Sequence, residues 1–275
     1  MKRTIGGLSM FVARAASLAR AGCDDASSAP LAPSATALAP AKPAAASARP
    51  FRVEQASSKL SFDMAAPVEK IHGRVANATT GELSIDPSDL TKTTGLVVVD
   101  LAGIELFQQV QDEKTKEFGP EKKSDLQNEH ARQWLEISPD APEDARKKNA
   151  HVEFAIRSIE SVSERDLGKL AGAERKVTVV AKGELLLHGR KSDKTVKLEA
   201  TFRYAGDQAT VVTIKTSEPF AVGLGEHDVR PRTGFGVLAG KTLEVLSPKV
   251  AKEAQVTLEI TANAAAPAAA PAASK

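Results

Sequence analysis

The residues most suited to chemistry are five histidines and the acids that lie beside some of them. The histidines are scattered along the chain, at His72, His130, His151, His188 and His227. No HExxH metal motif and no G-x-S-x-G nucleophile motif occurs. We therefore predict that the protein is not an enzyme and holds neither a cofactor nor a metal. The alternative is a hydrolase or metal enzyme that uses His130, His227 and nearby acids.

The densest polar cluster is the triplet Glu226-His227-Asp228. Such a triplet could bind a metal ion or supply half of a catalytic pair. Two arginines follow it, Arg230 and Arg232, and charged residues in a polar loop usually pair with one another. We therefore favour a salt bridge within the loop over a reactive site.

The single cysteine, Cys23, can form neither an internal disulfide nor a cysteine-based zinc cluster. The chain starts with Lys2 and Arg3, continues with a short apolar stretch, and places Gly22 directly before Cys23. A basic start, a short apolar stretch and small residues are typical of a secretory signal. The Gly-Cys ending resembles a bacterial lipobox, in which the cysteine is acylated. We expect a signal peptide over residues 1–23 and an exported lipoprotein anchored at the membrane, in the periplasm or cell envelope; an uncleaved N-terminus with an incidental cysteine is the alternative.

The charge of the chain argues against a nucleic-acid partner, and its hydropathy argues against a membrane-spanning helix after the N-terminal segment. The formal net charge is only +2, and the basic residues are spread among acids, so no nucleic-acid partner is expected. The triplet Arg146-Lys147-Lys148 is predicted to be a solvated surface turn. No run after the N-terminal segment approaches the roughly 20 apolar residues that a spanning helix needs.

Composition divides the rest of the chain into three parts. Residues 24–50 are almost all Ala, Pro, Ser and small polar residues, which predicts a flexible linker. The same composition returns in residues 263–275, which predicts a disordered Ala/Pro tail. The folded domain therefore spans residues 51–262, a length suited to one barrel.

Apolar residues alternate with polar ones through most of this domain, which predicts β-strands. The alternating segments are 59–64, 83–85, 96–101, 152–156, 177–187, 196–204, 211–216 and 256–260. One apolar and one polar face indicate an antiparallel sheet that is wet on one side. About eight such strands would close into a barrel, which removes the sheet edges. The fold class is therefore all-β, a single antiparallel barrel with its apolar face inward.

One charged region, residues 112–137, lacks this alternation and predicts a short helical insertion over Asp125–Leu135. In a helix, Leu126, His130 and Trp134 would share one face. The insertion is either a lid or rim that holds Trp134 over the barrel mouth, or a crossover whose tryptophan plugs one end of the core.

Several segments in order resemble the YceI-like family. They are Ser58–Phe62 with Ile71–Val75, Glu129-His130-Ala131 before Trp134, His151–Phe154, and the hairpin Gly183–Lys191 that runs into Thr195–Leu198. The sequence departs from the family pattern at Met64, where the family often has His, and at Gln127, where an acid would stand.

The resemblance implies an extended, lipocalin-like barrel whose lumen holds a long apolar ligand, a polyisoprenoid or related lipid. Apolar residues predicted to point inward are then the candidate ligand-binding residues. They are Phe62, Phe154, Leu185, Leu198 and Phe202, with Trp134 at the mouth. The alternative is a structural or stress-related interaction module whose barrel core is filled by side chains.

Overall fold

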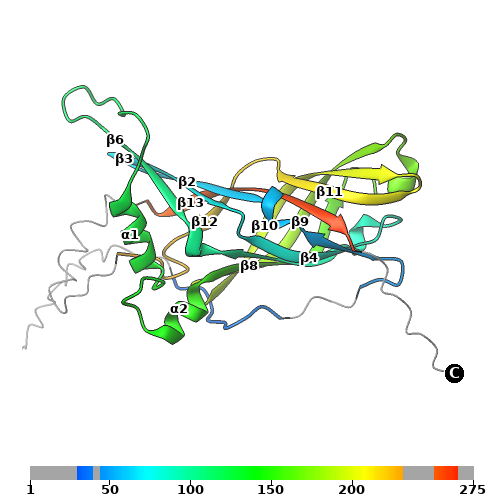
Figure 1. Ribbon diagram of the computed structural model, residues 1–275, viewed down its shortest axis with the longest axis horizontal. Helices are drawn as coiled ribbons and strands as arrows, with labels where there is room; N and C mark the ends of the chain where they lie inside the picture. The colour runs from blue at the N-terminus through cyan, green and yellow to red at the C-terminus, as the bar shows by residue number, and fades with distance from the viewer. Residues whose placement is uncertain (1–29, 40–43, 232–250, 266–275) are drawn as a thin grey trace, which may run out of the picture.

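The computed structural model describes residues 30–39, 44–231 and 251–265, which form a β-barrel with two α-helices at one end (Figure 1). The strands are β1 (Arg49–Val53), β2 (Lys59–Ala66), β3 (Glu69–Ala76), β4 (Thr79–Ile85), β5 (Thr94–Asp100), β6 (Glu105–Val110), β7 (Lys122–Lys123), β8 (His151–Val162), β9 (Glu174–Leu187), β10 (Arg190–Ala205), β11 (Gln208–Thr216), β12 (Phe220–Gly223) and β13 (Glu253–Ala264). The helices are α1 (Asp125–Trp134) and α2 (Glu143–Asn149).

The barrel closes through β1, which pairs with both β4 and β13. The eight strands around it run in the order β1-β4-β5-β8-β9-β10-β11-β13, and every neighbouring pair is antiparallel. Phe51 shows the closure directly, because it lies opposite Leu83 on one side and Ala264 on the other. The predicted all-β, single antiparallel barrel is confirmed.

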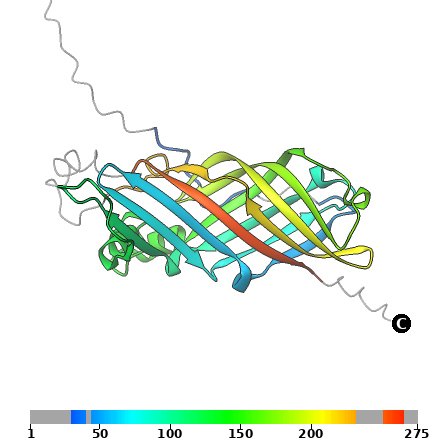
Figure 2. The ribbon, with the colours of Figure 1, turned by 90° about the horizontal axis from the view of Figure 1, so that it is seen from above.

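Three pairs of consecutive strands, β1–β2, β3–β4 and β5–β6, are each separated by only a short break. The two strands of each pair have different sets of neighbours in the sheet. A 3-10 turn (Gln55–Ser57) separates β1 from β2, Asn77 with φ of 55° separates β3 from β4, and a second 3-10 turn (Leu101–Gly103) separates β5 from β6. On the side of these breaks that faces away from the closed ring, β2 pairs with β13, β3 with β2, and β6 with β3. The strands β2, β3 and β6 therefore continue the wall beyond the closed ring, as the long tilted strands in Figure 2 show.

The inward side chains form two apolar clusters, one in each half of the barrel. The first contains Phe51, Leu167, Phe202 and Val212, all 3% exposed or less, and closes one end. We call it the closed-end core. The second contains residues such as Leu106 and packs against α1 at the opposite end. Alternation thus buries one face of each strand along the whole barrel.

The helical insertion predicted at Asp125–Leu135 is confirmed as α1, which ends at Trp134. Ser124 accepts a hydrogen bond from the Gln127 amide at 3.3 Å, as an N-cap does. Buried Asn128 attaches the helix to β6, because its side-chain oxygen accepts from Leu106 N at 2.8 Å.

The prediction that Arg146-Lys147-Lys148 is a solvated surface turn is correct in its exposure, because Lys147 and Lys148 are exposed, and wrong in its conformation, because all three residues lie in α2. Acidic residues Glu143 and Asp144 occupy the first turn of this helix and the three basic residues occupy its last turn. That order matches the helix dipole and stabilises a helix that periodicity alone does not predict.

Part of the predicted flexible linker, over residues 31–38, lies against the barrel instead. Ser34 forms an antiparallel bridge with Arg190, and Ala35 N donates to the Gly189 carbonyl at 2.9 Å. Leu38 N donates to the Glu153 carboxylate at 3.3 Å. Backbone hydrogen bonds need no apolar side chain, so an Ala/Pro/Ser-rich composition does not prevent this attachment.

Candidate functional site

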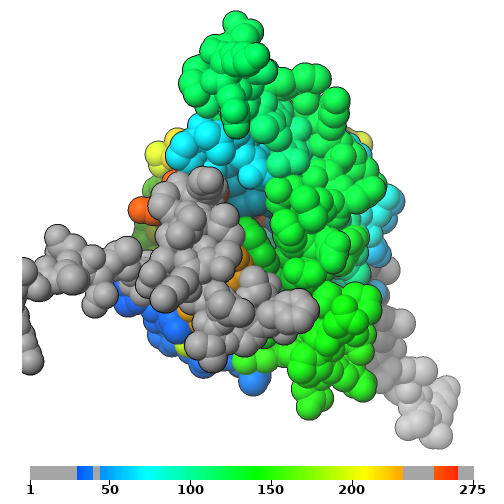
Figure 3. Space-filling model, turned by 90° about the vertical axis from the view of Figure 1, so that its left-hand side faces the viewer, coloured from blue at the N-terminus to red at the C-terminus, as the bar shows by residue number. Residues whose placement is uncertain are grey.

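An apolar cavity of about 200 Å³ lies inside the barrel. It extends from residues of the closed-end core, such as Leu83 and Ile260, to α1. Among the lining residues that the structure describes, Gln127 and His130 are the only polar ones, and both belong to α1. Figure 3 looks onto this end of the molecule, where the surface is hollowed between the cyan β2–β3 strands and the green helical segment. We call this end the mouth.

The cavity wall follows the two-residue period of the strands. Inward positions of β2, β10 and β13 contribute alternate residues to it. They are Leu60, Phe62 and Met64 from β2, Val196 and Leu198 from β10, and Ala254, Val256, Leu258 and Ile260 from β13. The same alternation that predicts the strands therefore selects the residues that face the lumen.

Five of the six predicted ligand-binding residues line this cavity: Phe62, Trp134, Phe154, Leu185 and Leu198. They come from four strands and one helix that are far apart in the chain and that barrel closure brings together. Their contact with a ligand stays a prediction.

Phe202 is the sixth, and the structure places it in the closed-end core instead of the cavity wall. It is 3% exposed and packs in the cluster that contains Phe51 and Val212. Its position in β10 explains this location. Phe202 is four residues past Leu198, at about 3.3 Å per residue, and therefore lies beyond the cavity.

Other lining residues were not predicted, because they lie in segments without a strong periodic signal. Phe220, Val222, Leu224 and Val229 come from the stretch after β11. The first three stand two residues apart, but the residues between them, Ala221 and Gly223, are small and not polar, so no apolar–polar alternation marks the strand. Val97 and Val99 belong to a predicted strand, but β5 is apolar at Leu96, Val97, Val98 and Val99 alike, so its sequence does not show which residues point inward.

At the mouth, α1 presents an aromatic pair to the cavity. The rings of His130 and Trp134 stack with their centroids 6.2 Å apart and an angle of 5° between their planes. Leu126, predicted on the same helix face, is instead 59% exposed. Gln127 donates to the Glu69 carboxylate of β3 at 2.8 Å, which attaches the helix to the rim.

Two buried histidines connect three segments near the mouth. His188, in the β9–β10 turn, contacts the His227 carbonyl through Nδ1 at 3.1 Å and the Glu136 carboxylate through Nε2 at 3.0 Å. His227 is fully buried, and its Nδ1 lies 3.2 Å from the Leu187 carbonyl. Because a carbonyl only accepts, Nδ1 carries the proton, and Nε2 faces the Ser192 hydroxyl at 3.0 Å. His188 itself adopts a positive φ of 50° in this turn, directly before Gly189.

Burial lowers the pKa of His227 below its ordinary value, although the neighbouring Glu226 carboxylate opposes this shift. Burial also raises the pKa of Glu226, but the hydrogen bond and charge of Lys194, at 2.6 Å, outweigh it and hold that pKa below its ordinary value. The pair Asp228–Arg230, at 2.9 Å, is a salt bridge of the predicted kind. The triplet is therefore bonded within the fold, and Arg232 lies outside the described residues.

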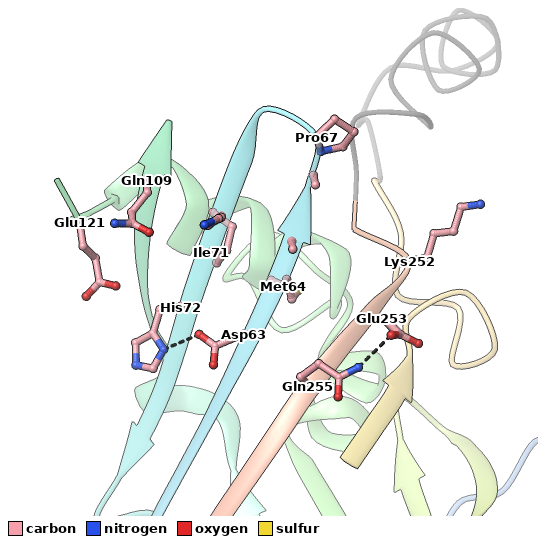
Figure 4. A pocket seen from close by; sticks show the side chains of 13 residues that line it. Asp63, Met64, Pro67, Ile71, His72, Gln109, Glu121, Lys252, Glu253 and Gln255 are labelled. Carbon is pink, nitrogen blue, oxygen red and sulfur yellow. Dashed lines mark hydrogen bonds and ion pairs between the residues drawn. The ribbon is translucent and has the colours of Figure 1, made fainter. Parts of the chain in front are cut away.

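A second, more open groove of about 580 Å³ runs along the rim of β2, β3 and β13 (Figure 4). It contains the exposed pair His72–Asp63 at 2.9 Å and the apolar residues Pro67 and Ile71. Met64 lines both this groove and the cavity, so the two share a wall. Within the described residues, no three His, Cys, Asp or Glu side chains are grouped as a metal site would require.

The predicted lipidation site, Cys23, and the predicted signal segment lie outside the described residues. None of the described helices has the length and apolar character needed to cross a membrane.

A closed antiparallel barrel, with a cavity that is apolar except at one end, defines the molecule as a lipocalin-like β-barrel. The chain belongs to the YceI-like family, because the model of the YceI-like domain matches residues 51–262, most of its length. The resemblance read from the sequence motifs is thereby confirmed.

Solved structures with related folds have low sequence identity to this chain. A polyisoprenoid binding domain from Saccharophagus degradans, implicated in plant cell wall breakdown, is 14% identical and aligns with a TM-score of 0.46, covering 78% of this chain and 98% of that chain. BcnA from Burkholderia cenocepacia is 16% identical, with a TM-score of 0.45, covering 76% and 98%. No curated protein matches this chain.

Proposed function

We propose that this protein binds a long apolar lipid, a polyisoprenoid or a related molecule, in its barrel lumen and carries out no catalysis. The observation that carries the proposal is the cavity of about 200 Å³, whose described wall has only Gln127 and His130 as polar residues. Apolar burial is non-directional and contributes roughly 25 cal/mol per Å². A long chain can therefore bind without a specific polar motif.

The cost of an unfilled lumen supports this function over a purely structural one. From the relation between cavity volume and stability, an empty apolar space of about 200 Å³ destabilises a protein by about 5 kcal/mol. That cost is comparable with the whole net stability of many domains. A barrel that served only as a solid module would be more stable with larger side chains in the lumen.

The shape and polarity of the cavity restrict the ligand. Its volume is below the roughly 300–1,000 Å³ of pockets for compact drug-sized ligands, so a slender chain fits best. No lysine or arginine is among the described lining residues, and a buried unpaired charge is costly. We therefore expect an uncharged head, such as an alcohol or quinone, to bind better than a phosphate.

The proposal also includes export and a lipid anchor. Its support is the N-terminal sequence, in which a basic start and a short apolar stretch precede Gly22-Cys23. An acyl group on Cys23 would keep the barrel beside a membrane of the cell envelope, where apolar ligands reside. Labelling with radioactive palmitate tests this part, and Cys23→Ser should remove the label.

Native mass spectrometry of the full chain, beside an organic extract of the same sample, tests the ligand. We expect a co-purifying mass that solvent releases as a prenyl lipid or quinone. The apo protein should then take up a prenyl alcohol more tightly than the matched prenyl phosphate. A protein that stays apo with both would refute lipid binding and favour an interaction module with an unused lumen.

A further inference from the structure

We propose that the rim of the mouth is a membrane-docking surface, at which the side chains of Val68, Val110 and Leu126 insert into a lipid bilayer. The apolar ligand would then pass between bilayer and cavity without crossing water. This inference rests on the proposed function, and it specifies the partner, a neutral bilayer surface, and the residues that contact it.

Exposed apolar side chains gather at this end of the molecule. Among the described residues, five large apolar side chains are exposed, and Val68 (46%), Val110 (55%) and Leu126 (59%) are three of them. Single exposed apolar residues are ordinary, whereas a cluster at a functional opening is typical of an interaction site.

All three lie around one residue of the rim, Glu69. Val68 precedes it in the turn between β2 and β3, and Val110 is its cross-strand partner in β6. Leu126 precedes Gln127, whose amide donates to the Glu69 carboxylate. Three segments distant in sequence therefore contribute one exposed apolar residue each to the same rim; Figure 1 shows β3, β6 and α1 together at this end of the molecule.

A path from this rim to the lumen follows the hairpin of β2 and β3. Pro67, next to Val68, and Ile71 line the groove of Figure 4, and Met64 lines both the groove and the cavity. The groove also carries charged side chains, among them Lys70, Glu121 and Glu253, so a prenyl chain entering from the rim would follow its apolar residues, Pro67, Ile71 and Met64, to the cavity. The other end of the barrel offers no such route within the described residues, because the closed-end core fills it.

The charges near the rim favour apolar insertion over electrostatic attraction. The segment 111–123 carries four lysines and four acids: Lys114, Lys116, Lys122, Lys123, Asp112, Glu113, Glu117 and Glu121. The four positive and four negative charges cancel. Binding of the rim to a bilayer should therefore not require anionic lipid, whereas a polybasic membrane site would require it.

The N-terminal segment leaves the barrel at the same end. Ala32 N donates to the Glu226 carbonyl at 2.8 Å, and Glu226 lies between the cavity-lining residues Leu224 and Val229. Six residues lie between Cys23 and Pro30, so the two Cα atoms are seven residue steps apart, a span of at most about 25 Å. An acyl group on Cys23 would therefore hold the mouth, rather than the closed end, beside the bilayer.

Vesicle co-sedimentation of the full chain carrying Cys23→Ser tests the surface without the anchor. On this background, Val68→Asp, Val110→Asp and Leu126→Asp are combined, and Leu96→Asp, at an exposed apolar residue of β5, is the matched control. We expect the triple variant to lower partition into phosphatidylcholine vesicles about tenfold, because charges replace the inserting side chains. The control should bind as its parent does, with or without added phosphatidylglycerol.

Equal partition of the triple variant and the control would overturn the docking surface, as would parent binding that requires phosphatidylglycerol or no parent binding at all. Ligand uptake separates this inference from the proposed function. The triple variant should load a prenyl alcohol from detergent as its parent does, but more slowly from vesicles. Equal loading rates from vesicles would refute docking alone, whereas a parent that loads from neither source would refute lipid binding.

Discussion

The ring of Phe62 in β2 covers Gly73, its cross-strand partner in β3, so closely that a methyl group at position 73 would lie 2.0 Å from the ring Cζ. The ring of Phe154 in β8 covers Gly183 in β9 in a similar way, at a corresponding distance of 2.5 Å, although the direct cross-strand partner of Gly183 is Ile156. In both pairs a glycine makes room for an aromatic ring of the cavity wall. The cavity is therefore shaped by small residues as well as by large ones.

Gly73→Ala should destabilise the barrel. The ring of Phe62 must move to accept the methyl group, which costs about 1–3 kcal/mol in the free energy of unfolding. Urea denaturation measures the change, and Gly103→Ala is the control because nothing lies within 4 Å of a methyl group there. Phe62→Leu should restore part of the loss in the double variant. A Gly73→Ala protein as stable as its parent would show that the ring is not held against the glycine.

Leu198→Trp should block the lumen, because a larger side chain occupies cavity volume. We expect at least a tenfold weaker uptake of a prenyl alcohol, while the melting temperature of the apo protein is unchanged or rises, as for other cavity-filling changes. Phe202→Leu, in the closed-end core, should do the opposite: it lowers stability by about 1–2 kcal/mol and leaves uptake unchanged. Unaltered uptake by Leu198→Trp would place the ligand outside the cavity.

Ligand binding should change the fluorescence of Trp134, which is the single tryptophan of the chain and lines the cavity at the mouth. A prenyl quinone that enters past α1 should quench this emission in a saturable titration. Trp134→Phe should abolish the signal yet retain uptake measured by mass spectrometry. If a loaded protein emits as the apo protein does, the ligand does not pass the His130–Trp134 pair.

Stability should fall as the pH drops below about 6.5, the ordinary pKa of His227. Burial lowers this pKa in the folded protein, so between the two values the unfolded chain binds more protons than the folded one. The carboxyls with lowered pKa, such as Glu184 and Glu226, titrate below their ordinary 4.5 and leave this window clear.

Thermal melts at pH 7.5 and pH 5.5 measure the effect. His227→Asn keeps an amide N–H for the Leu187 carbonyl but cannot titrate, so its melting temperature should fall less between the two pH values than that of the parent. An equal decrease in both proteins would mean that His227 does not cause the acid sensitivity.

The sequence by itself determined eight of the strands, the inward faces of those that alternate, and the barrel class, because alternation is a local property. Residues such as Val196 and Leu198 alternate with polar neighbours whatever their partners are, and the prediction held in β10, whereas β1, which closes the barrel, was not predicted. The family motifs determined the resemblance in the same way. Cys23 and the N-terminal segment supply predictions that depend on sequence alone.

Only the tertiary structure decided which inward residues face the cavity and which fill the core. Leu198 and Phe202 share one strand face and one pattern, yet the first lines the cavity and the second lies in the closed-end core. Their roles depend on depth along the barrel, which is set by the register with neighbouring strands. The buried contacts of His227, and the attachment of residues 31–38 to the β9–β10 turn, likewise join positions far apart in the chain. Local sequence patterns carry no information about such distant partners.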